Sequence, residues 1–169
     1  FKKAFKNFDS GATIFGYEVN DPERYGVVEF DETGQAISIE EKPPQPKSKY
    51  AIPGLYLYDE NVITIAKGLK PSERGELEIT DVNRYYLNKK ELKVFKINRG
   101  CAWLDAGTCA SLHESCSYVQ AIEARQGIKI GCPEEAALRS GLLSLHRFKK
   151  VVNSIPESEY KNYLKKICT

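Results

Sequence analysis

The stretch YGVVEFDETGQAISIEEKPPQP, residues 25–46, contains the strongest local structural signal in the chain. Two runs rich in strand-forming residues, GVVEF and AISIEE, flank the turn DETG, in which Gly34 suits a positive φ. The pattern therefore predicts a β-hairpin. Pro43 and Pro44 lack the backbone N–H that a sheet requires, so they end the second strand.

The end of this predicted strand is chemically unusual. Continued alternation places Ile37, Ile39 and Glu41 on one face, and an ionised carboxylate on an apolar face is costly unless it is paired or hydrated. Lys42 follows directly, and a lysine can bind a phosphate while a glutamate accepts hydrogen bonds from hydroxyl groups. Two interpretations remain open: part of a ligand site, or a solvated strand end stopped by prolines.

The rest of the chain alternates strand and helix patterns before it becomes helical. Strands are predicted at 12–19, 50–59 and 93–98, and helices at 59–69, 77–89 and 108–126. In the 50–59 segment, Pro53 indicates an edge, a bulge or an interruption of the ladder. After Gly127 the pattern favours short helices. We therefore expect an α/β body with a helical C-terminal layer.

Composition excludes several classes of protein. The 169 residues are 41% hydrophobic and 28% charged, which fits roughly one globular domain of about 100–200 residues. A net charge of +2 is too small to indicate a nucleic-acid partner, and no apolar run reaches the roughly 18–20 residues of a membrane span. We expect a cytoplasmic protein. The absence of methionine and the bulky Phe1 indicate a piece of a longer gene product.

Searches for hydrolase, metalloprotease and phosphate-loop motifs are negative. GxSxG, HExxH, GxxxxGK[ST] and GxGxxG are all missing. The five cysteines form no CxxC pair and have no histidine at ligand spacing, and neither His113 nor His146 has a paired cysteine or carboxylate at a telling spacing. Neither a zinc site nor a disulfide framework is therefore indicated.

Two further polar clusters can carry chemistry. Asp105 in CAWLDAGT can coordinate Mg²⁺ through one oxygen, or it can stabilise the start of the following helix. The loop at 72–76, SERGE, either closes over a ligand with Arg74 and Glu76 or is an exposed connector. The residues alone leave both pairs of alternatives open.

Five motifs in order resemble the C-terminal part of the glucose-1-phosphate thymidylyltransferases: DPERYGVVEFD, IEEKP, AIPGLYLYD, KPSERGELEITDVN and AWLDAGT. The resemblance runs from about residue 10 to the C-terminus and includes RQGIKIGCPEEAA. It implies part of a nucleotide-diphospho-sugar transferase fold with a Rossmann-like mixed sheet. It also implies that dTTP and glucose 1-phosphate react, with Mg²⁺, to give dTDP-glucose and pyrophosphate on the route to dTDP-rhamnose.

The resemblance also assigns roles to residues of this sequence. It implies that Gly26 contacts the glucose, that Glu41 holds sugar hydroxyls and that Lys42 binds the sugar phosphate. Lys42 and the metal-binding Asp105 are the implied catalytic residues. The other implied sugar-pocket residues are Ile52, Tyr56, Arg74 and Glu76. Pro53 and Ala106 stand where the family often has threonine, and neither change removes a charged ligand.

On this interpretation, residues 1–107 form the sugar-binding half of the transferase domain and residues 108–169 a helical region for assembly and regulation. The family's glycine-rich phosphate loop is not among the 169 residues, so we expect the nucleotide-binding half to lie outside them and this chain alone to be inactive. The resemblance implies that the intact enzyme is a homo-oligomer, a homotetramer. A non-catalytic regulatory or assembly module that binds nucleotide sugar is the alternative, and the nucleotide base is not encoded in these residues.

Overall fold

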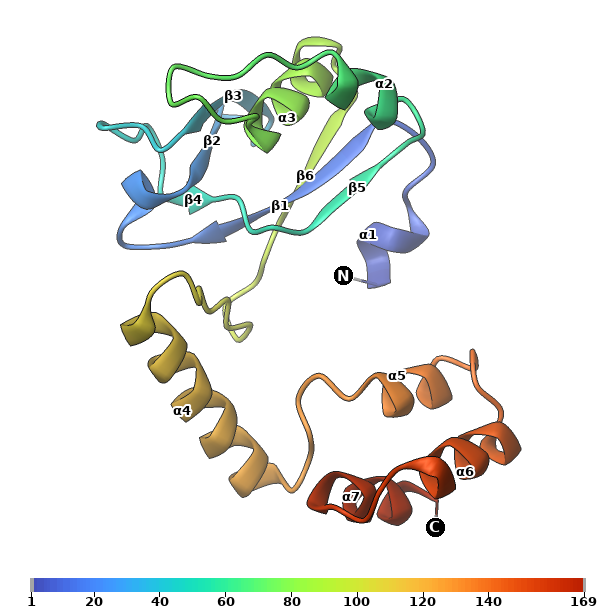
Figure 1. Cartoon of the computed structure of the whole chain (residues 1–169). Coiled ribbons are helices and arrows are strands. Elements are labelled where there is room, and N and C mark those ends of the chain that lie inside the picture. Colours follow the sequence, from blue (N-terminus) through green and yellow to red (C-terminus); the bar gives the residue numbers. More distant parts are fainter. Residues whose placement is uncertain (1, 169) are drawn as a thin grey trace. The chain divides into compact units, whose positions relative to one another are not determined.

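The structure, a computed structural model, describes residues 2–168 of the chain (Figure 1). It divides into two compact units, Phe1–Trp103 and Leu104–Thr169, and the boundary falls in the loop that precedes a long helix. Each unit has its own apolar core. The N-terminal unit contains all the strands of the described residues, and the C-terminal unit is helical.

The N-terminal unit is built on one mixed sheet of six strands. They are β1 (Ala12–Glu18), β2 (Gly26–Phe30), β3 (Ala36–Glu41), β4 (Tyr50–Ala51), β5 (Tyr56–Tyr58) and β6 (Leu92–Lys96). Strand β1 pairs in parallel with β6 along one edge and antiparallel with β4 and β5 along the other. Strand β2 continues the sheet from β4, and β3 is the outer strand beyond it. The predicted α/β class with a mixed sheet is confirmed.

The β2–β3 hairpin is present with the predicted turn, but its register shifts once. Gly26 pairs with Glu41 and Val28 with Ile39, whereas Phe30 pairs with Ala36. The shift leaves Ile37 without a cross-strand partner, and Ile37 is 53% exposed whereas Ile39 is 2% exposed. The prediction that Ile37 lies on a buried face is therefore wrong, because the extra residue changes the alternation of faces at this point.

The single strand predicted at 50–59 is split around Pro53 into β4 and β5, so the interruption alternative is confirmed. Proline has no N–H to donate to the ladder. Instead the N–H of Leu55 donates to the carbonyl of Pro53 at 2.7 Å, and the N–H of Ile52 donates to the carbonyl of Gly26 at 2.8 Å. Both short strands still run antiparallel to β1.

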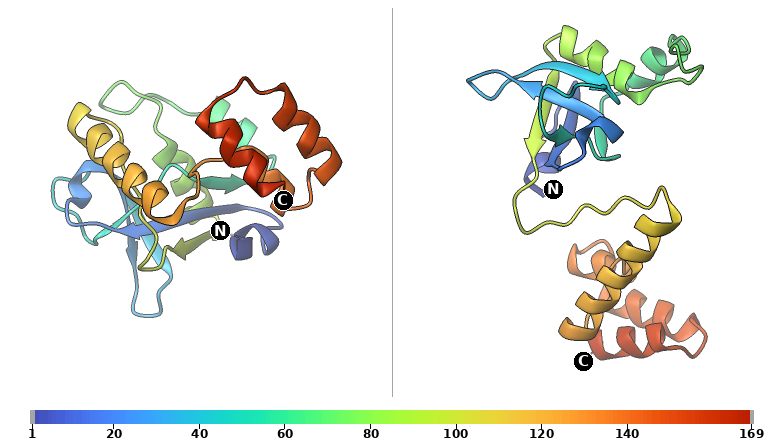
Figure 2. Two further views of the ribbon diagram at one scale, coloured as in Figure 1. Left: turned by 90° about the horizontal axis from the view of Figure 1, so that it is seen from below. Right: turned by 90° about the vertical axis from the view of Figure 1, so that its left-hand side faces the viewer.

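Helix α3 provides the main helical cover of this sheet (Figures 1 and 2). The helical segments of the unit are α1 (Lys2–Lys6), the 3-10 turn η1 (Pro22–Arg24), α2 (Val62–Lys67) and α3 (Ile79–Asn88). Helix α3 contacts α2 and the strands β1, β3 and β6. The guanidinium of Arg84 on α3 donates to the carbonyl of Ile39 on the outer strand, at 3.4 and 3.3 Å.

Asp59 joins three elements of this unit through its carboxylate. Its Oδ1 accepts from the Tyr86 hydroxyl at 2.7 Å and from the N–H of Asn61 at 3.0 Å, and its Oδ2 accepts from the N–H of Gly11 at 2.9 Å. These hydrogen bonds, that of Tyr86 first, lower the pKa of the Asp59 carboxyl below its usual value of 3.8. The ionised side chain therefore ties the end of β5 to α3 and to the start of β1.

The C-terminal unit consists of α4 (Cys109–Gln126), α5 (Pro133–Arg139), α6 (Leu145–Ser154) and α7 (Glu159–Ile167). Helices α5, α6 and α7 contact one another around buried Phe148, Val152 and Leu164. Helix α4 is capped by Thr108, whose hydroxyl accepts from the N–H of Ser111, and none of its own side chains is buried. No helix between residues 2 and 168 is both long and apolar enough to cross a membrane.

We predict that Asp59→Asn destabilises the N-terminal unit by about 1–3 kcal/mol at pH 7, because an amide replaces one acceptor oxygen with a donor. The loss should be read from urea denaturation. The pKa of Asp59 is depressed in the folded state, so its contribution is present above the unfolded pKa of about 3.9 and is lost as the pH falls through the folded value. The difference between the variant and the parent should therefore shrink toward pH 3.

The matched control is Glu60→Gln, a neighbouring exposed carboxylate. Its substitution should change stability by less than about 0.5 kcal/mol. Equal stability of Asp59→Asn and the parent at pH 7 would contradict the role given to this carboxylate.

Candidate functional site

The end of β3 lies against the first turn of α3, and a glycine makes the close approach possible. Gly26 and Glu41 are cross-strand partners. A Cβ at Gly26 would lie 3.1 Å from Oε2 of Glu41 and 3.2 Å from Oγ1 of Thr80. Because these separations are tighter than ordinary carbon–oxygen contacts, glycine leaves the room in which the two polar side chains meet.

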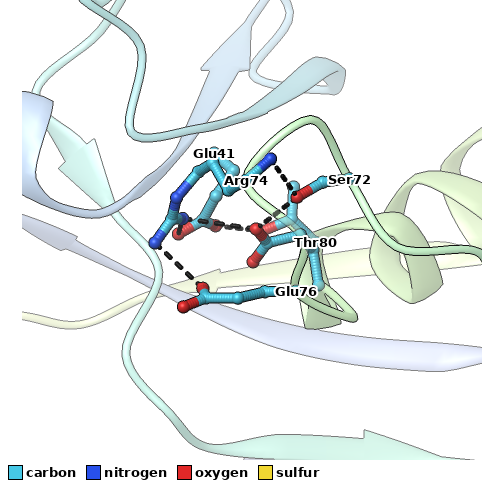
Figure 3. Close-up of polar contacts among 6 residues, drawn as sticks. Glu41, Ser72, Arg74, Glu76 and Thr80 are labelled. Carbon is cyan, nitrogen blue, oxygen red and sulfur yellow. Dashed lines mark hydrogen bonds and ion pairs between the residues drawn. The ribbon is translucent and has the colours of Figure 1, made fainter.

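The Glu41 carboxylate is partnered and partly accessible (Figure 3). The Thr80 hydroxyl donates to its Oε2 at 2.5 Å, and Nη1 of Arg74 lies 3.9 Å from its Oε1. The Glu41 side chain is 23% exposed. The charge that the strand pattern placed on an apolar face is thus stabilised by a buried hydroxyl and a nearby guanidinium, with one side left open.

The loop at 72–76 folds around Arg74 (Figure 3). The Arg74 guanidinium donates to Glu76 at 2.9 Å and to Glu78 at 3.3 Å. The Ser72 hydroxyl donates to Glu78 at 3.0 Å and accepts from the N–H of Arg74 at 3.2 Å. Three carboxylates, counting Glu41, share one guanidinium, so the site has an excess of acceptors and suits a ligand rich in hydroxyl donors.

Ile52 and Tyr56 lie near Gly26 and Glu41. Ile52 is 8% exposed, and its Cδ1 lies 3.9 Å from the position that a Cβ on Gly26 would take. Burial, and after it the charge of Glu41, raises the pKa of the Tyr56 phenol, so its hydroxyl stays protonated and able to donate. The structure therefore brings Gly26, Glu41, Ile52, Tyr56, Arg74 and Glu76 to one region of the N-terminal unit.

Lys42 lies where the chain leaves the strand. Its φ of 42° is left-handed, and its N–H donates to the carbonyl of Tyr25 at 3.0 Å. The side chain is exposed and makes no hydrogen bond or ion pair with residues 2–168 in the structure. The positive φ ends the alternation of faces directly after Glu41, which is the change of backbone direction needed if Lys42 and Glu41 bind one ligand. Its role stays a prediction.

Asp105 belongs to the C-terminal unit. Its carboxylate lies over Gly107, with Oδ2 3.2 Å from the place of a Cβ there, and its backbone carbonyl accepts from Ser115 of α4 at 3.2 Å. The helix cap itself is Thr108. A carboxylate is the oxygen ligand that Mg²⁺ takes, usually one or two of them together with phosphate oxygens. Among the described residues no group of three potential ligands gathers, so Asp105 fits only as one ligand of such a set.

Sequence reasoning missed Thr80 and Glu78. Thr80 is 2% exposed and holds Glu41, and Glu78 is the partner of Arg74 and Ser72. A signal for Thr80 exists in the sequence: Thr80 and Asn83 are spaced by three on the helix face that also carries Tyr86. Polar residues on a face that otherwise packs into the core require partners, so the pattern indicates a buried polar contact.

The candidate site is thus a group of carboxylates around one guanidinium at the end of the outer strand of a mixed sheet. A model of the nucleotidyl transferase family matches residues 1–121. The chain belongs to the nucleotidyl transferase family.

Curated relatives include the glucose-1-phosphate thymidylyltransferase of Xanthomonas campestris pv. campestris (strain B100), 49% identical over 156 residues, which are 92% of this chain and 53% of that protein. The glucose-1-phosphate thymidylyltransferase of Mycobacterium tuberculosis (strain ATCC 25618 / H37Rv) is 50% identical over 162 residues, 96% of this chain and 56% of that one. The resemblance indicated by the five motifs is confirmed. The chain spans about half the length of these relatives.

Two solved structures of sugar nucleotidyltransferases have a fold similar to that of this chain. A Bacillus anthracis structure, described as a glucose-1-phosphate thymidylyltransferase in complex with a sucrose, aligns with a TM-score of 0.61 at 44% identity over 69% of this chain and 46% of that one. A UDP-glucose pyrophosphorylase in complex with UDP-glucose aligns with a TM-score of 0.55 at 24% identity over 66% of this chain and 45% of that one, which supports the fold alone.

We predict that Gly26→Ala destabilises the N-terminal unit by about 1–3 kcal/mol, because the added methyl group overpacks the space between Glu41 and Thr80. Urea denaturation measures the loss. Gly54→Ala is the control, since a Cβ there meets nothing within 4 Å. If both variants unfold at the same urea concentration as the parent, the close approach at Gly26 has no energetic consequence.

Proposed function

We propose that this chain is the sugar-phosphate-binding part of a glucose-1-phosphate thymidylyltransferase, which joins dTTP and glucose 1-phosphate into dTDP-glucose and releases pyrophosphate. The observation that carries the proposal is the gathering of Gly26, Glu41, Ile52, Tyr56 and Arg74 at the end of β3. The sequence of the chain is 49% and 50% identical, over the aligned residues, to two proteins of that name.

The sugar is bound by the carboxylate of Glu41. Each oxygen of an ionised carboxylate accepts more than one hydrogen bond, so Glu41 can hold two sugar hydroxyls while it keeps its bond to Thr80. The Thr80 hydroxyl fixes the carboxylate before the ligand arrives. Ile52 and Gly26 offer apolar contact beside this carboxylate, and Tyr56 supplies a hydroxyl donor.

The reaction requires charge neutralisation and alignment more than a strong base. A phosphate oxygen of glucose 1-phosphate attacks the α-phosphorus of dTTP, a bond to that oxygen forms, and the bond to pyrophosphate breaks. Lys42 holds the attacking phosphate and offsets its negative charge. Mg²⁺, when bound, withdraws charge from the triphosphate oxygens, and Asp105 is the residue of this chain that would hold it.

The nucleotide is assigned to residues outside these 169, because the sequence contains no glycine-rich phosphate loop and the relatives are about twice as long as the matched part. Backbone amides of such a loop are what bind a triphosphate. The intact enzyme is proposed to be a cytoplasmic homotetramer whose product supplies dTDP-rhamnose synthesis, with residues 108–169 taking part in assembly and regulation.

We predict that the 169-residue chain binds glucose 1-phosphate and that Glu41→Gln weakens this binding roughly 10- to 100-fold. The range follows from the net value of hydrogen bonds to a charged group, about 1.5–3 kcal/mol. Isothermal titration calorimetry with glucose 1-phosphate measures it.

Glu40→Gln is the matched control, since Glu40 adjoins Glu41 on the strand but pairs with Lys47 at 2.9 Å on the surface. Lys42→Gln should weaken glucose 1-phosphate binding but not glucose binding, because it removes only the phosphate contact. Equal effects of Glu40→Gln and Glu41→Gln would refute the site. Affinity for dTDP-rhamnose without affinity for glucose 1-phosphate would instead support a regulatory module.

We also predict that the isolated chain forms no dTDP-glucose from dTTP, glucose 1-phosphate and Mg²⁺ above the rate without protein. Pyrophosphate release is the readout, and a full-length thymidylyltransferase from one of the relatives is the positive control. Turnover by the isolated chain within tenfold of that control would show that these residues bind the triphosphate themselves.

A further inference from the structure

Helix α4 carries three exposed side chains of metal-binding types on one face: Cys109, His113 and Cys116. In a helix, residues three and four apart are neighbours on the same face, and His113 is four residues after Cys109 and three before Cys116. All three are exposed, and none makes a side-chain hydrogen bond with residues 2–168 in the structure. None of these three residues is among those assigned to the proposed sugar site.

The linear spacing conceals the cluster. Zinc fingers and related sites are recognised by cysteines two to four residues apart, and C-x3-H-x2-C does not have that form. The helix changes the interpretation, because two ligands at i and i+4 on one helical face can bind the same ion, as in metalloprotease helices. The secondary structure, and not the motif, brings His113 next to the thiols.

Distances decide how many of these ligands one ion can use. Neighbours at i+3 or i+4 have Cβ atoms about 5–6 Å apart, which bonds of about 2.3 Å to sulfur and 2.0–2.1 Å to nitrogen can bridge. Cys109 and Cys116 are seven residues apart, roughly 10 Å along the axis, so one ion cannot bind both. In agreement, no group of three ligands gathers among the described residues.

We propose that α4 holds one borderline divalent transition metal ion, such as Zn²⁺ or Co²⁺, through His113 and either Cys109 or Cys116. Thiolate and imidazole select this class of metal over hard cations such as Mg²⁺. The remaining coordination positions are open to water because all three side chains face solvent. Binding releases the thiol proton, so the affinity falls as the pH is lowered.

The test is a titration of the reduced 169-residue chain with Co²⁺ at about pH 7.5, under a non-thiol reductant. Thiolate-bound Co²⁺ gives a charge-transfer absorption, which Zn²⁺ should abolish by displacement. His113→Ala and the double variant Cys109→Ser/Cys116→Ser should lose this absorption. Each single cysteine variant should weaken binding only about twofold, because the other of two equivalent pairs remains.

Cys101→Ser and His146→Ala are the matched controls. Cys101 is an exposed thiol outside the helix, and His146 is an exposed histidine with no cysteine three or four residues away. Both should bind Co²⁺ like the parent, and circular dichroism should show unchanged helix content in every variant. Undiminished absorption in His113→Ala, or complete loss in a single cysteine variant, would overturn the proposed arrangement.

Discussion

Strand β1 is the constraint on which the N-terminal unit depends. Its first four residues, Ala12–Phe15, are all at most 2% exposed, so both faces of the strand are covered and both edges are paired. β6 lies on one edge, while β4 and β5 share the other. Strand β4 pairs only with the C-terminal residues of β1, Tyr17 and Glu18. The β2–β3 hairpin pairs with β4 and therefore lies at this end of β1. In this position Glu41, at the end of β3, contacts Thr80 in the first turn of α3.

The candidate site is supported by a continuous stack of aromatic rings. Tyr56 stacks on Tyr58, and Tyr58 on Tyr86, with ring centroids 5.7 Å apart in each pair. Tyr86 is the last ring of the stack, and its hydroxyl donates a hydrogen bond to the Asp59 carboxylate. Side chains that are packed and hydrogen-bonded in this way hold one rotamer, which is what a binding site requires of the groups that touch its ligand. The same network thus serves stability and the position of Tyr56.

Much of the fold follows from local pattern, whereas the site depends on contacts between distant residues. The hairpin turn, the interruption at Pro53 and the span of α4 are all encoded within a few neighbouring residues. The exposure of Ile37 is not, because the register shift depends on the opposite strand. Nor is the bond between Thr80 and Glu41, which are 39 positions apart. Only the resemblance of ordered motifs to a known family connected those parts of the chain.

The outer strand β3 has a consequence for the behaviour of the protein in concentrated solution. An unpaired strand edge offers free backbone groups to a neighbouring molecule and so promotes aggregation. Here the Arg84 guanidinium already occupies the carbonyl of Ile39, and the unpartnered Ile37 interrupts the regular spacing that a second chain would have to match. The edge of the strand that carries Glu41 is therefore a poor template for pairing with a further strand.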